Sequence, residues 1–297
     1  MLEQAKQIIK EADVIVILSG AGLSVESGLD TFQSTTNSKN KIKNKKVTYA
    51  NLTTQEAFKH NNQLAWAFHG QRFNSYKKAK PHQGYDLLLN LVKEKEDYFV
   101  VTSNIDSAHH KVGFEHVYEV HGRLRKFQCI ECNNLWTAPD DTYFDVDVAT
   151  FTLRNKAPRC LCGGITRPNV MLFGYDTGFN KNETDEQSKA FNEFMFKYDQ
   201  GDHQIALIEI GAGESVRTIR MMSEFIHERV PGATLIRINP VDISVPDERA
   251  IVIQMNALEA IQSLTGADVT QTQFHRPSLP PLAGGGGLKR TPQTASV

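Results

Sequence analysis

Short runs of consecutive apolar residues recur along this chain, and segments with helical spacing of apolar positions lie between several of them. Unbroken apolar runs of this length are typical of strands that are buried on both faces. Their alternation with helices predicts an α/β fold with a doubly wound parallel sheet, covered by helices on both sides. The six runs that we interpret as strands are Val14 to Leu18, Tyr98 to Val101, Val117 to Val120, Ile205 to Ile210, Leu235 to Ile238 and Ile251 to Ile253.

Small and hydrogen-bonding residues follow five of the predicted strands. Because the carboxyl ends of parallel strands meet at one edge of the sheet, we expect these residues to converge on a crevice that binds a nucleotide. The five groups are Gly20-Ala21-Gly22, Ser103-Asn104-Ile105-Asp106, His121-Gly122, Gly211-Ala212-Gly213 and Asn239.

The first of these groups opens a glycine-rich segment, Gly20 to Gly28. A strand that runs into glycines predicts a turn that holds phosphate at the N-terminus of the next helix, because backbone amides there can approach an anion closely. The strict dinucleotide motif has a third glycine where this chain has Val25. A simple tight turn between strand and helix is therefore the alternative.

All four cysteines lie between residues 122 and 172, where the alternation of strands and helices breaks off. Two close pairs, Cys129-Ile130-Glu131-Cys132 and Cys160-Leu161-Cys162, predict one tetrahedral zinc site. Four sulfur ligands leave no open position, so such a site is structural rather than catalytic. Buried free cysteines or a disulfide are the alternatives, and the apparent intracellular context disfavours the disulfide.

Composition and charge argue against several classes of protein. The 297 residues are 40% hydrophobic, enough for a substantial core, and their formal net charge of −1 gives no general attraction to nucleic acid or anionic lipid. No apolar run approaches the roughly 20 residues that span a bilayer. The mixed-charge start from Met1 to Lys10 does not resemble a secretory signal. We therefore expect a cytoplasmic protein that binds neither nucleic acid nor membrane, and the sequence does not indicate an oligomeric state.

The composition changes after Thr265. Polar residues, Pro280-Pro281 and the run Gly284 to Gly287 follow, with too little apolar content to offset the entropy of ordering. We predict a disordered C-terminal tail over residues 266–297.

The motifs described so far belong to a longer ordered series. It comprises Gly20 to Gly28, Ser103-Asn104-Ile105-Asp106, Val120-His121-Gly122, the four cysteines, Arg167 to Gly174, Ile210 to Gly213 and Ile238-Asn239-Pro240. Over roughly residues 1–265 this series resembles the sirtuin family. The resemblance implies a Rossmann-like NAD-binding part, about 1–121 and 173–265, with a zinc-binding module inserted at about 122–172. It also implies an acyl-lysine protein or peptide substrate in the cleft between the two.

The resemblance implies that NAD is cleaved at its nicotinamide bond and that the acyl group of a modified lysine passes to ADP-ribose. His121 is then the general base, a task that suits an imidazole titrating near neutral pH. Asn104 is expected to position the nicotinamide ribose or a nearby water, and Asp106 to bind the nicotinamide carboxamide. Capping of the following helix by Asn104 and Asp106 is the alternative, and it is compatible with ligand contact.

Further contacts follow from the same resemblance. The expected cofactor-binding residues are Gly20, Ala21, Gly22, Glu26, Phe32, Gln33, Ser103, Asn104, Asp106, Gly211, Ala212, Gly213, Asn239, Asn256 and Ala257. Val170, Phe173 and Gly174 are expected to bind the substrate, whose backbone pairs with this segment as an added strand.

Several residues depart from the usual sirtuin pattern. Gln33 replaces an arginine near the cofactor, Ser103 replaces a glutamine, and Tyr175 stands where an acid often follows Phe-Gly. The lysine-rich run of residues 38–46 either compensates for the missing arginine or forms a solvated loop. Arg72 either pairs with the carboxylate of a succinyl or malonyl group or lies exposed on a helix.

We therefore predict an NAD-dependent protein-lysine deacylase of a divergent, bacterial-type branch, with NAD and structural Zn²⁺. The alternatives are an NAD hydrolase, an ADP-ribosyltransferase or an NAD-sensing protein of the same fold, motivated by Gln33 and Ser103. The segment Asn169 to Gly174 favours the deacylase, because a plain hydrolase has no need to pair with a peptide.

Overall fold

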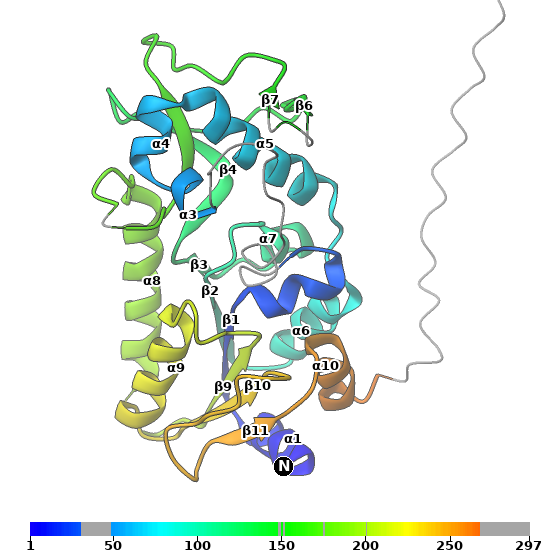
Figure 1. Ribbon diagram of the computed structural model, residues 1–297. Helices are drawn as coiled ribbons and strands as arrows, with labels where there is room; N and C mark the ends of the chain where they lie inside the picture. Colours follow the sequence, from blue (N-terminus) through cyan, green and yellow to red (C-terminus); the bar gives the residue numbers. More distant parts are fainter. Residues whose placement is uncertain (31–48, 148–149, 151, 175, 200, 268–297) are drawn as a thin grey trace, which may run out of the picture. The chain divides into compact units, whose positions relative to one another are not determined.

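Six parallel strands form the central sheet of the computed structural model, in the order β11-β10-β9-β1-β2-β3 (Figure 1). They are β1 (Val14–Ser19), β2 (Asp97–Thr102), β3 (Val117–Glu119), β9 (Ile205–Ile210), β10 (Ala233–Ile238) and β11 (Ile251–Ile253). Each predicted apolar run forms one of these strands, so the prediction of a doubly wound parallel sheet is confirmed. The structure describes residues 1–30, 49–147, 150, 152–174, 176–199 and 201–267.

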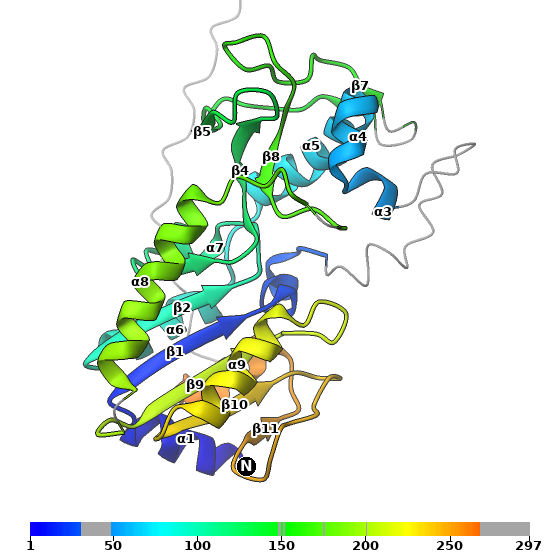
Figure 2. The ribbon, with the colours of Figure 1, turned by 90° about the vertical axis from the view of Figure 1, so that its left-hand side faces the viewer.

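Helices cover both faces of this sheet, as Figures 1 and 2 show. The helices on one face are α1 (Leu2–Glu11), α6 (Gln83–Lys93), α7 (Ala108–Val112) and α10 (Ala257–Thr265), and those on the other are α8 (Asn182–Tyr198) and α9 (Thr218–Arg229). In β1, Ile15 and Ile17 belong to the first core, and Val14, Val16 and Leu18 to the second. Burial on both faces explains why the strand is an unbroken apolar run.

The order of the strands reverses at one point of the sheet. The chain builds β1, β2 and β3 toward one edge, and then returns to build β9, β10 and β11 on the other side of β1. The order therefore reverses between β1 and β9, which pair in parallel up to Ser19↔Ile210. Doubly wound sheets bind ligands at such a switch point, beyond the carboxyl ends of the strands. The loops that follow Ser19 and Ile210 are in that position.

A second, antiparallel sheet has the order β5-β4-β8. Its strands are β4 (Gly122–Cys129), β5 (Leu135–Thr137) and β8 (Thr166–Val170); nearby elements are β6 (Val146–Asp147), β7 (Thr152–Leu153), α3 (Tyr49–Leu52), α4 (Gln55–His60) and α5 (Asn62–Lys78). Trp66 of α5 stacks on Phe144 with 5.1 Å between ring centroids, and its ring lies 4.8 Å from that of Phe127 in β4. Helix α5 therefore shares the core of the small sheet, which the sequence analysis does not anticipate.

Residues Met1–Ala267 form one compact unit, and the tail predicted to be disordered lies almost wholly outside the described residues. Within the described part of the chain, no helix is both long and apolar enough to cross a membrane. The domain boundaries and the cytoplasmic location stay predictions.

Candidate active site

A cleft of ≈ 540 Å³ lies at the carboxyl ends of the central strands, and its volume is typical of ligand sites. The loops after β1, β2, β3, β9 and β10 line it, together with the start of α10 and the segment after β8. The predicted site residues that line it are Gly20, Ala21, Gly22, Glu26, Ser103, Asn104, Asp106, His121, Phe173, Gly174, Gly211, Ala212, Gly213, Asn239, Asn256 and Ala257. The expected convergence of five strand ends is therefore present.

Two of the expected cofactor residues lie outside the part of the chain that the structure describes, and one expected substrate residue is not among those that line the cleft. Phe32 and Gln33 lie outside the described residues, as do the lysine-rich run and Tyr175. Val170 is described, but its side chain is only 3% exposed and packs in the core of the small sheet. Any contact of Val170 with substrate would therefore be made by its backbone, and its assignment to the substrate stays a prediction. Lining residues that the sequence analysis does not assign include Tyr76 and Asp242.

Glycines allow the loops after β1 and β9 to touch. A Cβ atom on Gly20 would lie 2.6 Å from the carbonyl oxygen of Gly211, and one on Gly22 would lie 2.6 Å from the Cα of Gly211. Gly211 has a φ of +64°, which L side chains rarely adopt. The amides of Gly20 and Gly22 donate to the carbonyls of Ile210 (2.9 Å) and Gly211 (3.0 Å). The amides of these two glycines therefore join the loops after β1 and β9.

The helix that follows β1 is a 3₁₀ helix, η1 (Ala21–Ser27), with Gly20 as its N-cap. Glu26 in this helix connects it to α10, because its Oε1 accepts a hydrogen bond from the amide of Leu258 at 3.2 Å. Its other carboxylate oxygen, Oε2, is buried and has no hydrogen-bond partner among the described residues. Buried acceptors without partners are costly, so this oxygen has an unused capacity to accept a hydrogen bond.

A buried polar network joins the loops after β1 and β2. Asp106 accepts hydrogen bonds from the Ser24 hydroxyl (2.7 Å) and from the amide of Ala108 (2.8 Å). Asn104 donates from Nδ2 to the carbonyl of Gly20 (3.0 Å) and to the Ser24 hydroxyl (3.2 Å). Asp106 therefore binds the first turn of α7 and also lines the cleft, so capping and ligand contact are compatible at this residue.

Burial sets the protonation of this network. It raises the pKa of Asp106 above its ordinary value, although the hydrogen bonds from Ser24 and Ala108 oppose the rise. Burial, together with the charge of Asp106, raises the pKa of Tyr85 well above its usual range. The Tyr85 hydroxyl lies 2.9 Å from the Ser24 hydroxyl and stays protonated, so it can donate to the network.

His121 lies between β3 and β4 and is half-buried in the cleft. Its Nε2 is 3.2 Å from Oγ1 of Thr218, the first residue of α9. Burial lowers the pKa of His121 below its ordinary value, and a backbone hydrogen bond at Ser103 opposes this. The neutral imidazole is therefore favoured at pH 7, and in that form the ring can accept a proton. The sequence gives no signal for Thr218, which comes from a helix 97 residues further along the chain.

The four cysteines come together at the end of β4 and before β8, with all four sulfur atoms within 4.8 Å of one another. The sulfurs of Cys129 and Cys162 and those of Cys132 and Cys160 are 3.6 Å apart, far beyond a disulfide bond of about 2.05 Å. Tetrahedral zinc with bonds of about 2.3 Å holds its sulfurs about 3.8 Å apart. The donor set and the spacing therefore fit a structural zinc site.

Arg72 lines the cleft and is half-buried, so it is not a fully exposed helical arginine. Its Nη2 donates to the hydroxyl of Tyr76 at 2.5 Å, and its guanidinium lies 5.9 Å from the ring centroid of Phe68. One turn earlier, burial lowers the pKa of His69 to about 3. His69 is therefore neutral, and Arg72 carries a positive charge at the cleft lining.

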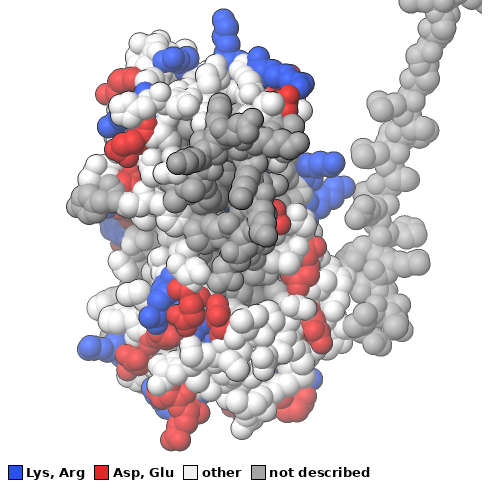
Figure 3. Space-filling model, viewed as in Figure 1, with Lys and Arg blue, Asp and Glu red and all other residues white. Residues whose placement is uncertain are grey.

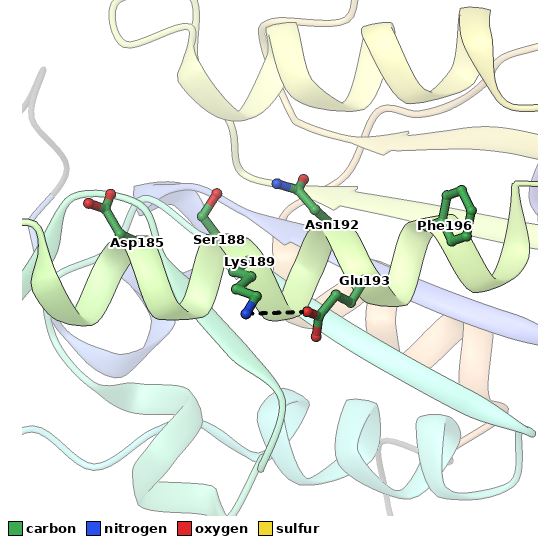
Figure 4. A pocket seen from close by; sticks show the side chains of 6 residues that line it. All are labelled: Asp185, Ser188, Lys189, Asn192, Glu193 and Phe196. Carbon is green, nitrogen blue, oxygen red and sulfur yellow. Dashed lines mark ion pairs between the residues drawn. The ribbon is translucent and has the colours of Figure 1, made fainter.

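A second hollow lies along the outer face of α8 (Figure 4). Its lining residues all belong to that helix: Asp185, Ser188, Lys189, Asn192, Glu193 and Phe196. It contains no predicted site residue, and its charged pair, Lys189 and Glu193, is solvent-exposed with 3.8 Å between the charged atoms. On the face shown in Figure 3, described basic and acidic side chains are interspersed, as a net charge near zero predicts. The cleft is the better candidate for a functional site.

Comparison with known proteins identifies the family of the chain. A family model described as the Sir2 family matches residues 20–196, more than half of the chain. The NAD-dependent protein deacylase of Aquifex aeolicus (strain VF5) is 35% identical over 161 residues, which cover 54% of this chain and 61% of that protein. The NAD-dependent protein deacetylase of Shouchella clausii (strain KSM-K16) is 32% identical over 166 residues, covering 56% and 63%. The chain thus spans about three fifths of the length of these relatives.

Among solved structures, the crystal structure of a Sir2 homolog–NAD complex is similar, with a TM-score of 0.67 and 24% identity. The likeness covers 89% of this chain and 92% of that chain and shows a shared fold. Because the family model matches most of the chain that builds the cleft and the cysteine cluster, this protein belongs to the Sir2 family, the sirtuins.

Proposed function

We propose that this sirtuin is an NAD-dependent protein-lysine deacylase, which releases nicotinamide and transfers the acyl group of a modified lysine to ADP-ribose. The observation that carries the proposal is the convergence of His121, Asn104 and Asp106 with the glycine loops on one cleft. The names of the relatives, NAD-dependent protein deacylase and deacetylase, support it.

The residues of the cleft fit a dinucleotide. The loops at Gly20 and Gly211 approach so closely that a side chain on either would overlap backbone atoms. Glu26 has a buried carboxylate oxygen ready to accept a hydrogen bond, for which a ribose hydroxyl is a suitable donor. Asn239 and Asn256 line the same cleft. Bound NAD supplies an electrophilic ribose carbon with nicotinamide as its leaving group.

The hydrogen bonds of each polar residue determine what it offers to the ligand. Asn104 uses both Nδ2 hydrogens within the protein, so its Oδ1 is the group that can accept from a ribose hydroxyl or a water. Each carboxylate oxygen of Asp106 accepts one bond and has a lone pair left for an amide N–H. His121, neutral at pH 7, accepts a proton from a hydroxyl, and Thr218 orients the ring.

The segment after β8 supports a peptide as the second substrate. Met171 and Phe173 are 44% and 40% exposed, whereas Leu172 between them is buried. Such alternation is typical of an extended segment, whose exposed side chains can pack against an extended peptide. The amide of Met171 donates to the carbonyl of His121 at 2.9 Å. A peptide on this segment would therefore lie beside the proposed base.

The proposal is tested by measuring nicotinamide release from NAD with and without an acetyl-lysine peptide. We expect release to require the peptide and to yield free lysine. The variant His121→Ala should lose the activity and keep its zinc content, and His60→Ala, a change at an exposed position on α4, should behave like wild type. Release at the same rate without peptide would instead identify an NAD hydrolase.

A further inference from the structure

A buried ion pair lies directly beneath the proposed peptide-binding segment. Nη1 and Nη2 of Arg167 donate to Oδ1 and Oδ2 of Asp176 at 2.7 and 2.6 Å, and the two side chains are 0% and 2% exposed. Taking two charges out of water costs several kcal/mol per ion, so a buried pair is poor evidence for stabilisation alone. The presence of this buried pair therefore needs an explanation other than stabilisation of the fold.

The pair holds the backbone immediately before the segment Met171–Gly174 and within it. Nη2 of Arg167 also donates to the carbonyl of Val170 at 2.6 Å, immediately before the segment. Oδ2 of Asp176 accepts from the amide of Leu172 at 2.9 Å. One guanidinium and one carboxylate thus fix the start and the middle of the segment to the residues that flank it.

The neighbouring amides are held by other parts of the molecule. The amide of Met171 donates to the carbonyl of His121 at 2.9 Å, and that of Phe173 donates to the carbonyl of Thr53 at 2.8 Å. Three successive amides therefore have three separate anchors: the strand junction that carries His121, the carboxylate of Asp176, and the turn between α3 and α4. Only the middle anchor is a side chain, so it is the one that substitution can remove.

We propose that Arg167 and Asp176 are positioning residues that hold the segment Met171–Gly174 in place beside His121 and so set the affinity for the acylated peptide. This rests on the proposed function, because it assigns the peptide to that segment. The sequence has Tyr175 where a sirtuin often has an acid after Phe-Gly, and the structure places the carboxylate one residue later, at Asp176.

Two variants distinguish the role of the pair in holding the segment from the effect of burying its charges. The double variant Arg167→Met/Asp176→Leu replaces the pair with apolar side chains, which removes the buried charges and also the bonds to the backbone. The variant Asp176→Asn keeps an oxygen that can accept from Leu172 but leaves Arg167 without its counter-charge. We expect the double variant to unfold near the wild-type temperature and Asp176→Asn to unfold at a lower one.

The decisive kinetic readout is the KM for an acetyl-lysine peptide compared with the KM for NAD. In the double variant we expect the peptide KM to rise about tenfold or more, the typical effect of losing a hydrogen bond to a charged group, while the NAD KM stays within about twofold. A matched control removes the pair formed by exposed Arg154 and half-buried Asp147 in the same part of the fold, with 2.9 Å between the charged atoms, and should change neither KM.

Hydrogen exchange provides a readout that does not need activity. We expect the amides of residues 170–174 to exchange about tenfold faster in the double variant than in wild type, with no change in the central sheet. A double variant with wild-type peptide KM, or with wild-type exchange at these amides, would overturn the positioning role. If wild type shows no peptide-dependent release, the proposed function fails, and the exchange rates still decide whether the pair holds the segment.

Discussion

The close contact between the loops after β1 and β9 predicts a specific response to Gly20→Ala. The new Cβ would lie 2.6 Å from the carbonyl oxygen of Gly211 and 2.7 Å from the Cα of Ala212. The first distance is about 0.8 Å shorter than ordinary van der Waals contact at 3.4 Å, and both neighbours are backbone atoms. Overpacking of this kind costs about 1–3 kcal/mol. The loops must separate, and the cleft between them must change shape.

Two other glycines provide the comparison. Gly113→Ala creates no overlap, because nothing lies within 4 Å of its Cβ, but its φ of +103° imposes a strain of about 1–2 kcal/mol. Gly211→Ala combines a φ of +64° with a contact of 2.4 Å to the amide nitrogen of Leu23. Its cost is the sum of both effects, about 2–5 kcal/mol.

Urea unfolding measures the loss of stability in each variant, and calorimetric titration with NAD measures the change in the shape of the binding site through the affinity. Gly20→Ala and Gly113→Ala should lose similar stability, but only Gly20→Ala should weaken NAD binding, by about tenfold or more, because a displacement of this size breaks well-aligned hydrogen bonds. Wild-type affinity for NAD in Gly20→Ala would refute the idea that this contact shapes the binding site.

Further predictions concern the metal site, pH, acyl preference and the backbone. Cys129→Ser should lose zinc and unfold at a lower temperature than wild type. Metal analysis of the folded wild-type protein tests the zinc assignment, which a protein without zinc would contradict. Burial lowers the pKa of His109 to about 3, so the folded state binds fewer protons than the unfolded state between pH 3 and 6.5. The contribution of His109 to the free energy of unfolding, fully present above pH 6.5, should therefore fall by about 1.4 kcal/mol per pH unit as urea unfolding is repeated at lower pH. His69 contributes in the same way, so His109→Gln should reduce the slope by about that amount without removing it. Arg72→Ala should lower turnover of succinyl-lysine relative to acetyl-lysine peptides, and an unchanged ratio would remove the carboxylate-binding role. Ser107 has a φ of 61°, so Ser107→Gly should raise the free energy of unfolding by about 1 kcal/mol, and an equal or lower value would show that no strain is relieved.

The central sheet and the cleft were predictable because both depend on local patterns. Runs such as Val14 to Leu18 are apolar throughout since both faces of the strand are covered, and parallel strands bring the residues after them to one edge. The cysteine pairs carried an equally local signal, because metal ligands cluster in sequence at turns.

Contacts between distant segments were not predictable in the same way. Trp66 joins the core of the small sheet through Phe127 and Phe144, which lie more than sixty residues further along the chain. One signal was present in the sequence: Ala65 to Phe68 are four consecutive apolar residues, which in a helix point in all directions and are typically covered on more than one side. The position of Thr218 beside His121 depends on tertiary placement alone, because 97 residues separate them in the sequence.

Binding of NAD in the cleft is the central claim, and calorimetric titration of the full chain with NAD, in the absence and presence of an acetyl-lysine peptide, tests it most directly. The structure predicts saturable binding of one NAD per chain, with heat from continued turnover when the peptide is present. It also predicts that Gly20→Ala weakens the binding. No detectable association of NAD with the wild-type protein under either condition would contradict the account.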